Sequence, residues 1–149
     1  MMEMTDLVKS WQNFTSFENA TKYLRSKGKR RTIRKFLKVL NHLPYVDWET
    51  SVTNIKWMSF SDITLMSRGM KEFKGEVIVS PNAIAGQCHK VAALDKKLNP
   101  AWKLCVGFAM SEECASTEWH YHSFCVNEHG NIVEPTTHER ERYVGVIVS

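Results

Sequence analysis

The order of the helical and strand-forming segments constrains the fold of this chain most strongly. Residues 16–27 and about 29–43 are predicted to be helices, because apolar residues recur at helical spacing and Gly28 and Pro44 fit their ends. Strand-like segments follow in the second half, at 101–110, 119–126, 131–134 and 143–148. Helices first and a sheet afterwards, without βαβ alternation, predict an α+β domain whose helices pack on a C-terminal antiparallel sheet.

A further helix is predicted between these two halves, and it begins at a cysteine. The segment 80–87 is rich in turn-forming residues, whereas Cys88 to about Leu98 consists of good helix formers. The amide donors and the positive end of the helix dipole at such a position favour thiolate over thiol, and the thiolate is the nucleophile. Cys88 is therefore the first candidate for a catalytic residue. The competing interpretation is a small buried hydrophobe.

A hairpin is predicted downstream, because the turn signal Asn-Glu-His-Gly at 127–130 separates two apolar stretches. If the turn centres on Glu128, His122 lies directly opposite Glu134 on one face of the sheet. A carboxylate there could hold the imidazole in one tautomer and leave its other nitrogen for the thiol. A register shift of one residue would put the two side chains on opposite faces.

Other residues compete for these roles. His120 is the alternative base, because it lies two residues before the preferred histidine and points to the same side of a strand. His89 follows the thiol directly and is expected to point elsewhere on the helix. Asn82 and Gln87 are the side-chain candidates for stabilising an oxyanion, beside the backbone N–H of the nucleophile. Glu134 could instead be an exposed acid at the end of a strand.

A zinc site is a rival interpretation of the same region. His120, His122, Cys114 and Cys125 supply four side chains that zinc accepts as ligands. The paired cysteines of structural zinc modules are absent, however, and an odd separation along one strand turns His122 and Cys125 to opposite faces. The sequence also has no phosphate-binding glycine loop and no dinucleotide fingerprint. We therefore expect neither a metal nor a cofactor.

Four segments of the second half together resemble a known family. They are residues 88–92 (Cys-His-Lys-Val-Ala), 105–109 (Cys-Val-Gly-Phe-Ala), 122–126 (His-Ser-Phe-Cys-Val) and 130–136 (Gly-Asn-Ile-Val-Glu-Pro-Thr). Their order and spacing resemble the papain-like thiol fold, and its transglutaminase-like branch is the more similar. The closing Tyr-Val-Gly-Val at 143–146 is similar to small bacterial and tailed-phage (viral) proteins of that layout. The resemblance covers about residues 80–149 and leaves the helical half, 1–79, unmatched.

The resemblance implies thiol-dependent acyl chemistry on an amide or related bond, by a hydrolase or an acyl transferase. Cys88 would attack a carbonyl, His122 would take the thiol proton and later protonate the leaving group, and Glu134 would orient the imidazole. The family more often has Asp than Glu as the acid, and a tryptophan next to the cysteine, which this chain lacks. The substrate would be a protein, a peptide or a small amide. The alternative is a catalytically inactive papain-like scaffold that binds and modulates a host or partner protein.

Composition bounds the class of protein further. A chain of 149 residues with 43% hydrophobic content fits one globular domain, 1–149. Its four cysteines and the lack of a secretory signal predict reduced thiols in the cytoplasm of a cell or of an infected host. No apolar run approaches the roughly 20 residues that span a bilayer, so we expect no membrane partner.

Positive charge is concentrated in one segment. Seven basic residues and no acid lie between Lys27 and Lys38, in a chain whose net charge is +4. Such a run can bind phosphate or nucleic acid. We expect a solvated helix face rather than a nucleic-acid site, because the same helix carries an apolar stripe that explains most of its pattern: Ile33, Phe36, Leu37 and Leu40.

Overall fold

The computed structural model describes residues 30–43, 58–111 and 119–149. The chain divides into two compact units, Met1–Arg68 and Gly69–Ser149. The helix predicted at 16–27 and the cysteine at 114 lie outside the described residues. The single domain expected from the length of the chain stays a prediction.

In the first unit, helix α2 (Arg30–Asn41) packs against helix α4 (Phe60–Met66). The predicted helix at about 29–43 is thus confirmed with slightly narrower bounds. Helix α4 begins where the Ser59 side chain accepts a hydrogen bond from the Asp62 N–H at 3.1 Å. The predicted apolar stripe of α2 is confirmed as well, because all four of its side chains are buried: Ile33, Phe36, Leu37 and Leu40.

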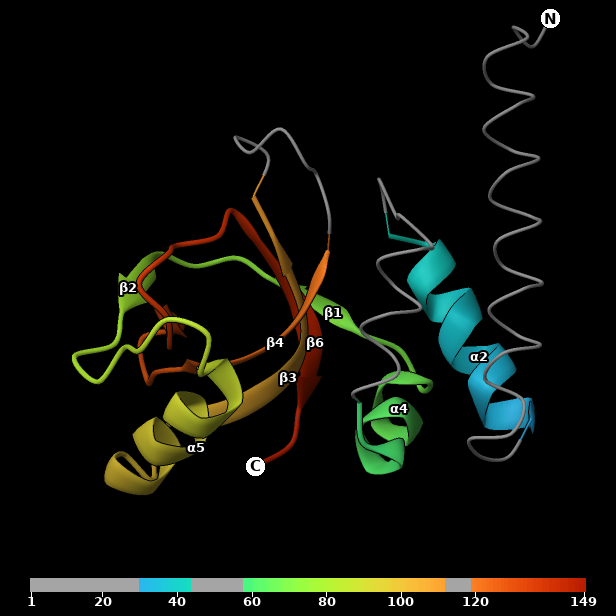
Figure 1. Cartoon of the computed structure of the whole chain (residues 1–149), viewed down its shortest axis with the longest axis horizontal. Coiled ribbons are helices and arrows are strands. Elements are labelled where there is room, and N and C mark those ends of the chain that lie inside the picture. The colour runs from blue at the N-terminus through green and yellow to red at the C-terminus, as the bar shows by residue number, and fades with distance from the viewer. Residues whose placement is uncertain (1–29, 44–57, 112–118) are drawn as a thin grey trace, which may run out of the picture. The chain divides into compact units, whose positions relative to one another are not determined.

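The second unit combines a curled six-stranded sheet with helix α5 (Cys88–Leu98), as Figure 1 shows. The α+β class is confirmed. The strand order is β1-β6-β3-β4-β5-β2. The strands are β1 (Lys71–Phe73), β2 (Val77–Val79), β3 (Lys103–Met110), β4 (His120–Val126), β5 (Ile132–Glu134) and β6 (Arg142–Ile147).

The strand directions correct one expectation. The four strands predicted from the second half pair antiparallel with one another, as expected. However, β2 pairs parallel with β5, so the sheet is mixed. Strands β1 and β2 come from residues 71–79, which were grouped with the helical half. The β-rich run Val77, Ile78 and Val79 does indicate β2, whereas β1 is three residues long, too short for an alternating pattern to stand out.

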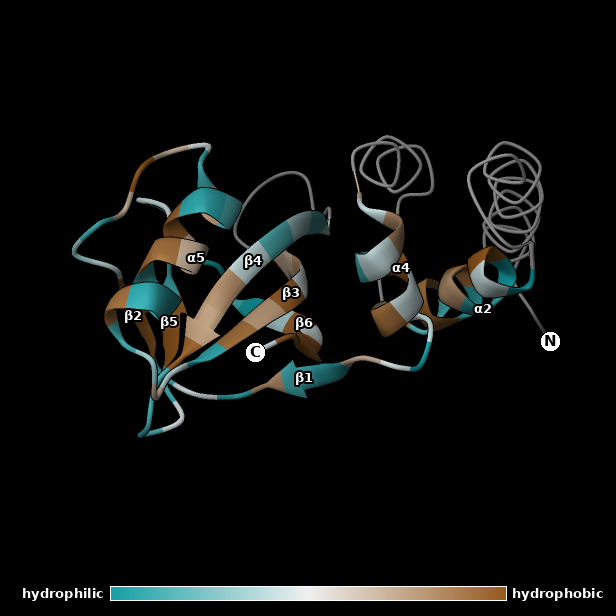
Figure 2. Cartoon of the chain, turned by 90° about the horizontal axis from the view of Figure 1, so that it is seen from below, coloured by the Kyte–Doolittle hydropathy of each residue, from teal (hydrophilic) through white to brown (hydrophobic). Residues whose placement is uncertain are grey.

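Helix α5 packs on β4 and β3, and Figure 2 shows it along one face of the sheet. The Cys125 thiol donates a hydrogen bond to the Ala92 carbonyl of α5 at 3.3 Å. Because side chains alternate along a strand, the odd-numbered residues of β4 face the helix and the even-numbered ones face away. The opposite face carries a core cluster of Cys105, Ala109, Phe124, Val126, Ile132 and Tyr143.

The hairpin between β4 and β5 has a different register from the predicted one. Val133 lies opposite Cys125, so the turn centres on His129 and not on Glu128. The side chain of Asn127 sets this turn, because its Oδ1 accepts the N–H groups of His129 and Asn131 at 3.0 and 2.9 Å. Gly130 completes the turn with φ +78°.

This register shift of two residues preserves the face of each side chain. His122 therefore does not lie directly opposite Glu134, as predicted, but diagonally across from it on the same face. Diagonal neighbours in a sheet are within reach of long side chains. A shift of one residue would have separated them.

Candidate active site

Cys88 is the first residue of α5, as the sequence predicted. Gln87, the N-cap, makes no side-chain capping hydrogen bond, and the first backbone bond of the helix runs from the Val91 N–H to the Gln87 carbonyl at 3.0 Å. The N–H groups of the first turn thus have no capping side chain to occupy them. They and the helix dipole favour an anion at this end of α5. The Cys88 side chain is half-buried, which leaves it partly accessible.

The loop before Cys88 is tied to both neighbours of the site. Ser80 donates its hydroxyl to the buried Asp95 Oδ1 on α5 at 2.9 Å, and its N–H to the Glu134 carbonyl on β5 at 2.8 Å. The Ile84 N–H donates to the Pro135 carbonyl at 3.1 Å. These bonds fix the start of α5 beside the end of β5. They explain why residues distant in sequence meet here.

The two side-chain oxyanion candidates have different surroundings. Asn82 donates its amide to Asp95 Oδ1 at 3.1 Å, so its side chain is directed at the helix and supports the loop. The second oxygen of Asp95, Oδ2, is buried and has no hydrogen-bond partner in the described part of the chain. Gln87 is exposed at the start of α5. The Asn82 amide is thus occupied by Asp95, and the Gln87 side chain makes no capping bond, whereas the first-turn N–H groups are adjacent to the thiol.

The free edge of β4 brings the thiol to His122. Among the described residues, β5 pairs with β4 only at Cys125 and Val126. Backbone groups alternate along a strand, so the Ser123 N–H points to the same edge as that of Cys125, beyond the end of β5. The Ser123 N–H and the His122 imidazole both act on Cys88 there, and each lowers the pKa of its thiol. Cys88 thus meets β4 at residues with which β5 does not pair.

His122 and Glu134 form the second contact of the site. The imidazole Nε2 lies 2.8 Å from Oε1 and 3.0 Å from Oε2 of Glu134. His122 is 4% exposed and Glu134 is 0% exposed. With Nε2 held by the carboxylate, Nδ1 is left to exchange a proton with the thiol. The structure thus brings Cys88, His122 and Glu134 together in the order of contacts that a triad requires.

Two residues that the sequence reasoning missed complete the environment of Glu134. Thr136 donates its N–H and its hydroxyl to Oε2 at 2.8 and 2.9 Å. Tyr143 donates its hydroxyl to Oε1 at 2.8 Å and accepts the Arg140 N–H at 2.9 Å. Glu134 is therefore not the exposed strand-end acid of the competing interpretation. The Pro-Thr after Glu134 and the tyrosine of the closing segment were visible in the sequence, but only the fold shows that they meet.

The electrostatics favour an ion pair between the thiol and the imidazole. Burial would raise the pKa of Cys88, but hydrogen bonds from His122 and His89, the His122 charge and the Ser123 N–H outweigh it and lower that pKa to about 5. Burial would lower the pKa of His122, but its hydrogen bonds to Cys88 and Glu134 and their charges raise it to about 9. Between these values the pair is thiolate and imidazolium.

The carboxylate behind the histidine stays ionised in the same range. Burial would raise the pKa of Glu134, but the hydrogen bond and charge of His122, together with the Thr136 and Tyr143 donors, hold it below its usual range. Every neighbour of the carboxylate is a donor. Glu134 thus carries the negative charge that stabilises the His122 imidazolium.

His89 lies at the thiol, contrary to the expectation that it would point elsewhere. Its imidazole lowers the pKa of the Cys88 thiol, and its Nδ1 lies 2.5 Å from the Ser123 hydroxyl. Adjacent residues of a helix do not face each other, so helical geometry alone gave no signal for this contact. Ser123 and Tyr121 of β4 hold the His89 ring beside the thiol.

The remaining candidates have other environments. His120 lies at the start of β4 with an exposed side chain. Cys105 and Cys125 are buried, and burial raises the pKa of each to about 12. Among the described residues, no group of three or more His, Cys, Asp or Glu side chains could hold a metal ion.

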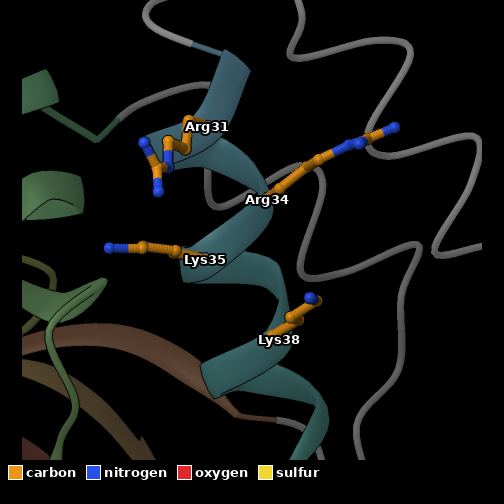
Figure 3. A pocket seen from close by; sticks show the side chains of 4 residues that line it. All are labelled: Arg31, Arg34, Lys35 and Lys38. Carbon is orange, nitrogen blue, oxygen red and sulfur yellow. The ribbon is translucent and has the colours of Figure 1, made fainter.

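The basic face of α2 is the other feature singled out by the sequence. Figure 3 shows the four side chains that line its pocket, and they diverge: Arg31 and Lys35 extend to one side of the helix, Arg34 and Lys38 to the other. Charges that diverge do not enclose one anion. The geometry fits the solvated helix face, and the lack of specific nucleic-acid affinity stays a prediction.

Comparisons of this chain with family models, with curated proteins and with solved structures find no match. No described helix is both long enough and apolar enough to cross a bilayer. The functional interpretation therefore rests on the residues at the start of α5 and on their contacts.

Proposed function

We propose that this protein is a cysteine hydrolase or acyl transferase of papain-like or transglutaminase-like type, acting on an amide or related bond. The observation that carries the proposal is the chain of contacts from Cys88 to His122 to Glu134 at a helix N-terminus. A buried carboxylate, a buried imidazole and an accessible thiol are the parts that thiol acyl chemistry needs.

The fold assignment belongs to the same proposal. The start of α5 supplies the thiol, β4 supplies the histidine two residues after it begins, and β5 ends in the acid. This order matches the resemblance seen in the sequence. The packing of α5 on an antiparallel ladder of β3, β4 and β6 supports it.

The acylation step follows from the resting ion pair. The Cys88 thiolate attacks the substrate carbonyl carbon, the C–S bond forms, and the carbonyl oxygen becomes an oxyanion beside the first-turn N–H groups of α5. The His122 imidazolium then gives its proton to the leaving group as the carbonyl–leaving-group bond breaks. The product of this step is a thioester on Cys88 and a neutral His122.

The deacylation step reverses these proton movements. Water or an amine attacks the thioester carbonyl while neutral His122 accepts its proton. The C–S bond breaks, and the thiolate and imidazolium are restored. Glu134 keeps the imidazole in one orientation through both steps and stabilises its positive charge.

An activated ester tests this proposal without knowledge of the natural substrate. With p-nitrophenyl acetate, we expect a burst of nitrophenolate and one acetyl group on Cys88, detected by mass spectrometry of the intact protein and its peptides. Cys88→Ala should abolish the burst, and His122→Ala should come close to abolishing it. Lys90→Ala, an exposed change on the same helix turn, should retain it.

One result would contradict the proposed enzymatic activity. An acetylation level that is the same in the Cys88→Ala variant, with the label spread over lysines, would mean that the thiol is not an activated nucleophile. The protein would then fit the alternative of an inactive scaffold that binds a partner protein.

A further inference from the structure

His89 holds a fixed position beside the nucleophile. Its Nδ1 lies 2.5 Å from the Ser123 hydroxyl. Its ring lies 4.4 Å from the Tyr121 ring, centroid to centroid, at an interplanar angle of 40°. These two contacts come from β4, so they fix an otherwise exposed side chain of α5 against the strand that carries the histidine of the proposed triad.

The contacts of His89 and Ser123 close a cluster around the thiol. The His89 imidazole and the backbone N–H of Ser123 both act on the Cys88 sulfur, where they lower the pKa of the thiol. The Ser123 side chain is buried and holds His89 in turn. Ser123 therefore acts on the sulfur directly through its backbone and indirectly through His89.

We propose that His89 is a positioning residue that donates a hydrogen bond to the Cys88 thiolate and fixes the direction of the sulfur. This inference rests on the proposed function and adds a second imidazole to it. Because His89 contacts the sulfur and is not assigned a proton transfer, its role differs from that of His122.

The two imidazoles differ in their surroundings in a way that fits two roles. His122 is buried and bound to a carboxylate, which favours its charged form. His89 is exposed, and no carboxylate forms an ion pair with it in the part of the chain that the structure describes. In the resting ion pair, the His89 imidazole and the Ser123 N–H therefore supply the thiolate with donors besides the His122 imidazolium.

The test measures how the rate of Cys88 alkylation by iodoacetamide depends on pH in the full-length protein. The midpoint of the rise in rate reports the apparent pKa of the thiol, and peptide mass spectrometry assigns the label to Cys88. In His89→Ala we expect the apparent pKa to rise by about one unit, because a hydrogen bond to a charged group is lost. Lys90→Ala is the matched control on the neighbouring exposed position and should leave the profile unchanged.

Two amide variants show whether the shift in His89→Ala comes from a lost hydrogen bond or from a disturbed local structure. His89→Asn and His89→Gln place a donor near the positions of Nδ1 and Nε2, and we expect at least one of them to restore most of the wild-type profile. If neither does so, the proposed hydrogen bond is refuted even if His89→Ala shifts the profile.

The Ser123 hydroxyl supplies an independent check. Ser123→Ala keeps the backbone N–H but releases the His89 ring, so it should shift the profile in the same direction by a smaller amount. In the His89→Ala background the same change should add nothing, because both act through one contact. Full additivity of the two shifts would contradict the inference.

The inference and the proposed function can fail separately. If His122→Ala raises the apparent pKa of Cys88 while His89→Ala leaves it unchanged, the positioning role is overturned and the proposed enzyme stands. If the wild-type thiol already titrates at its ordinary value, both are overturned.

Discussion

Helix α5 contacts two thiols, and they have opposite properties. At its first residue, Cys88 has a pKa lowered to about 5. Four residues later the Ala92 carbonyl meets Cys125 of β4, whose pKa is raised to about 12. Burial raises the pKa of both thiols, so burial does not explain the difference.

The partners of the two sulfurs explain it. Cys125 donates its proton to a carbonyl oxygen, and the nearby Asp95 charge further opposes a thiolate. Cys88 instead meets donors, from the imidazoles of His122 and His89 and from the Ser123 N–H. The middle of α5 presents the Ala92 carbonyl group, which stabilises a thiol. The start of the same helix presents free N–H groups, which stabilise a thiolate.

The largest expected effect is the difference in reactivity between these thiols. At neutral pH, limiting iodoacetamide should label Cys88 at least about a thousandfold faster than Cys105 or Cys125 in the folded protein. Peptide mass spectrometry at short times measures the three rates. Labelling Cys125 as fast as Cys88 would remove the contrast on which the proposed site depends.

Replacing the base should give the next largest effect. In His122→Ala, the hydrogen bond and charge that lower the Cys88 pKa are lost, so that pKa should rise. The rate of the nitrophenolate burst should fall by about 10²–10⁴-fold. His120→Ala, two residues away on the same strand, is the matched control and should change the burst little. An equal loss in both variants would mean that the burst does not report on this imidazole.

Removing the carboxylate charge should have a smaller effect on rate and a clear effect on stability. Glu134→Gln keeps the shape but loses the charge that raises the His122 pKa, so the pKa of His122 should fall and the burst should decrease on the order of tenfold. The upper pH limit of activity should move below about 9.

Glu134→Gln should also lower the stability of the protein, because Glu134 is fully buried. Its oxygens accept only from donors, so an amide NH₂ must face one of them, at a cost of about 1–3 kcal/mol in the free energy of unfolding. Urea denaturation measures it. Glu128→Gln, in the exposed turn of the same hairpin, is the control and should be neutral.

The smallest effect is expected when one of the hydrogen-bond donors to the Glu134 carboxylate is removed. Tyr143→Phe removes one donor from Glu134 Oε1 and the acceptor of the Arg140 N–H, and should cost about 1 kcal/mol of stability. The burst should decrease only severalfold, because Thr136 still holds the other oxygen. A loss as large as that of His122→Ala would assign Tyr143 a more direct role.

Local patterns predicted the elements of the site well. The bounds of α5 and the buried stripe of α2 follow from helix formers, stops and helical spacing, all of which lie within a few residues of each other. The presence of His122 on a strand followed by a hairpin and Glu134 was also predictable. The register error was two residues, so His122 and Glu134 still lie on the predicted face of the sheet.

Contacts between distant segments were not predictable in the same way. The register depends on how the Asn127 side chain closes the turn, and several turns fit the same four residues. Tyr143 reaches Glu134 only because the closing strand β6 lies beside β3 in the curled sheet. His89 meets the thiol because β4 supplies Ser123 and Tyr121 to hold it.

The central claim is that Cys88 and His122 form a thiolate–imidazolium pair in the resting protein. NMR titration of the Cys88 Cβ carbon and the His122 ring carbons tests it most directly. The account predicts two steps shared by both residues, near pH 5 and near pH 9, because the pair titrates as a unit. Separate steps near the ordinary values of about 8.5 for cysteine and about 6.5 for histidine would contradict it.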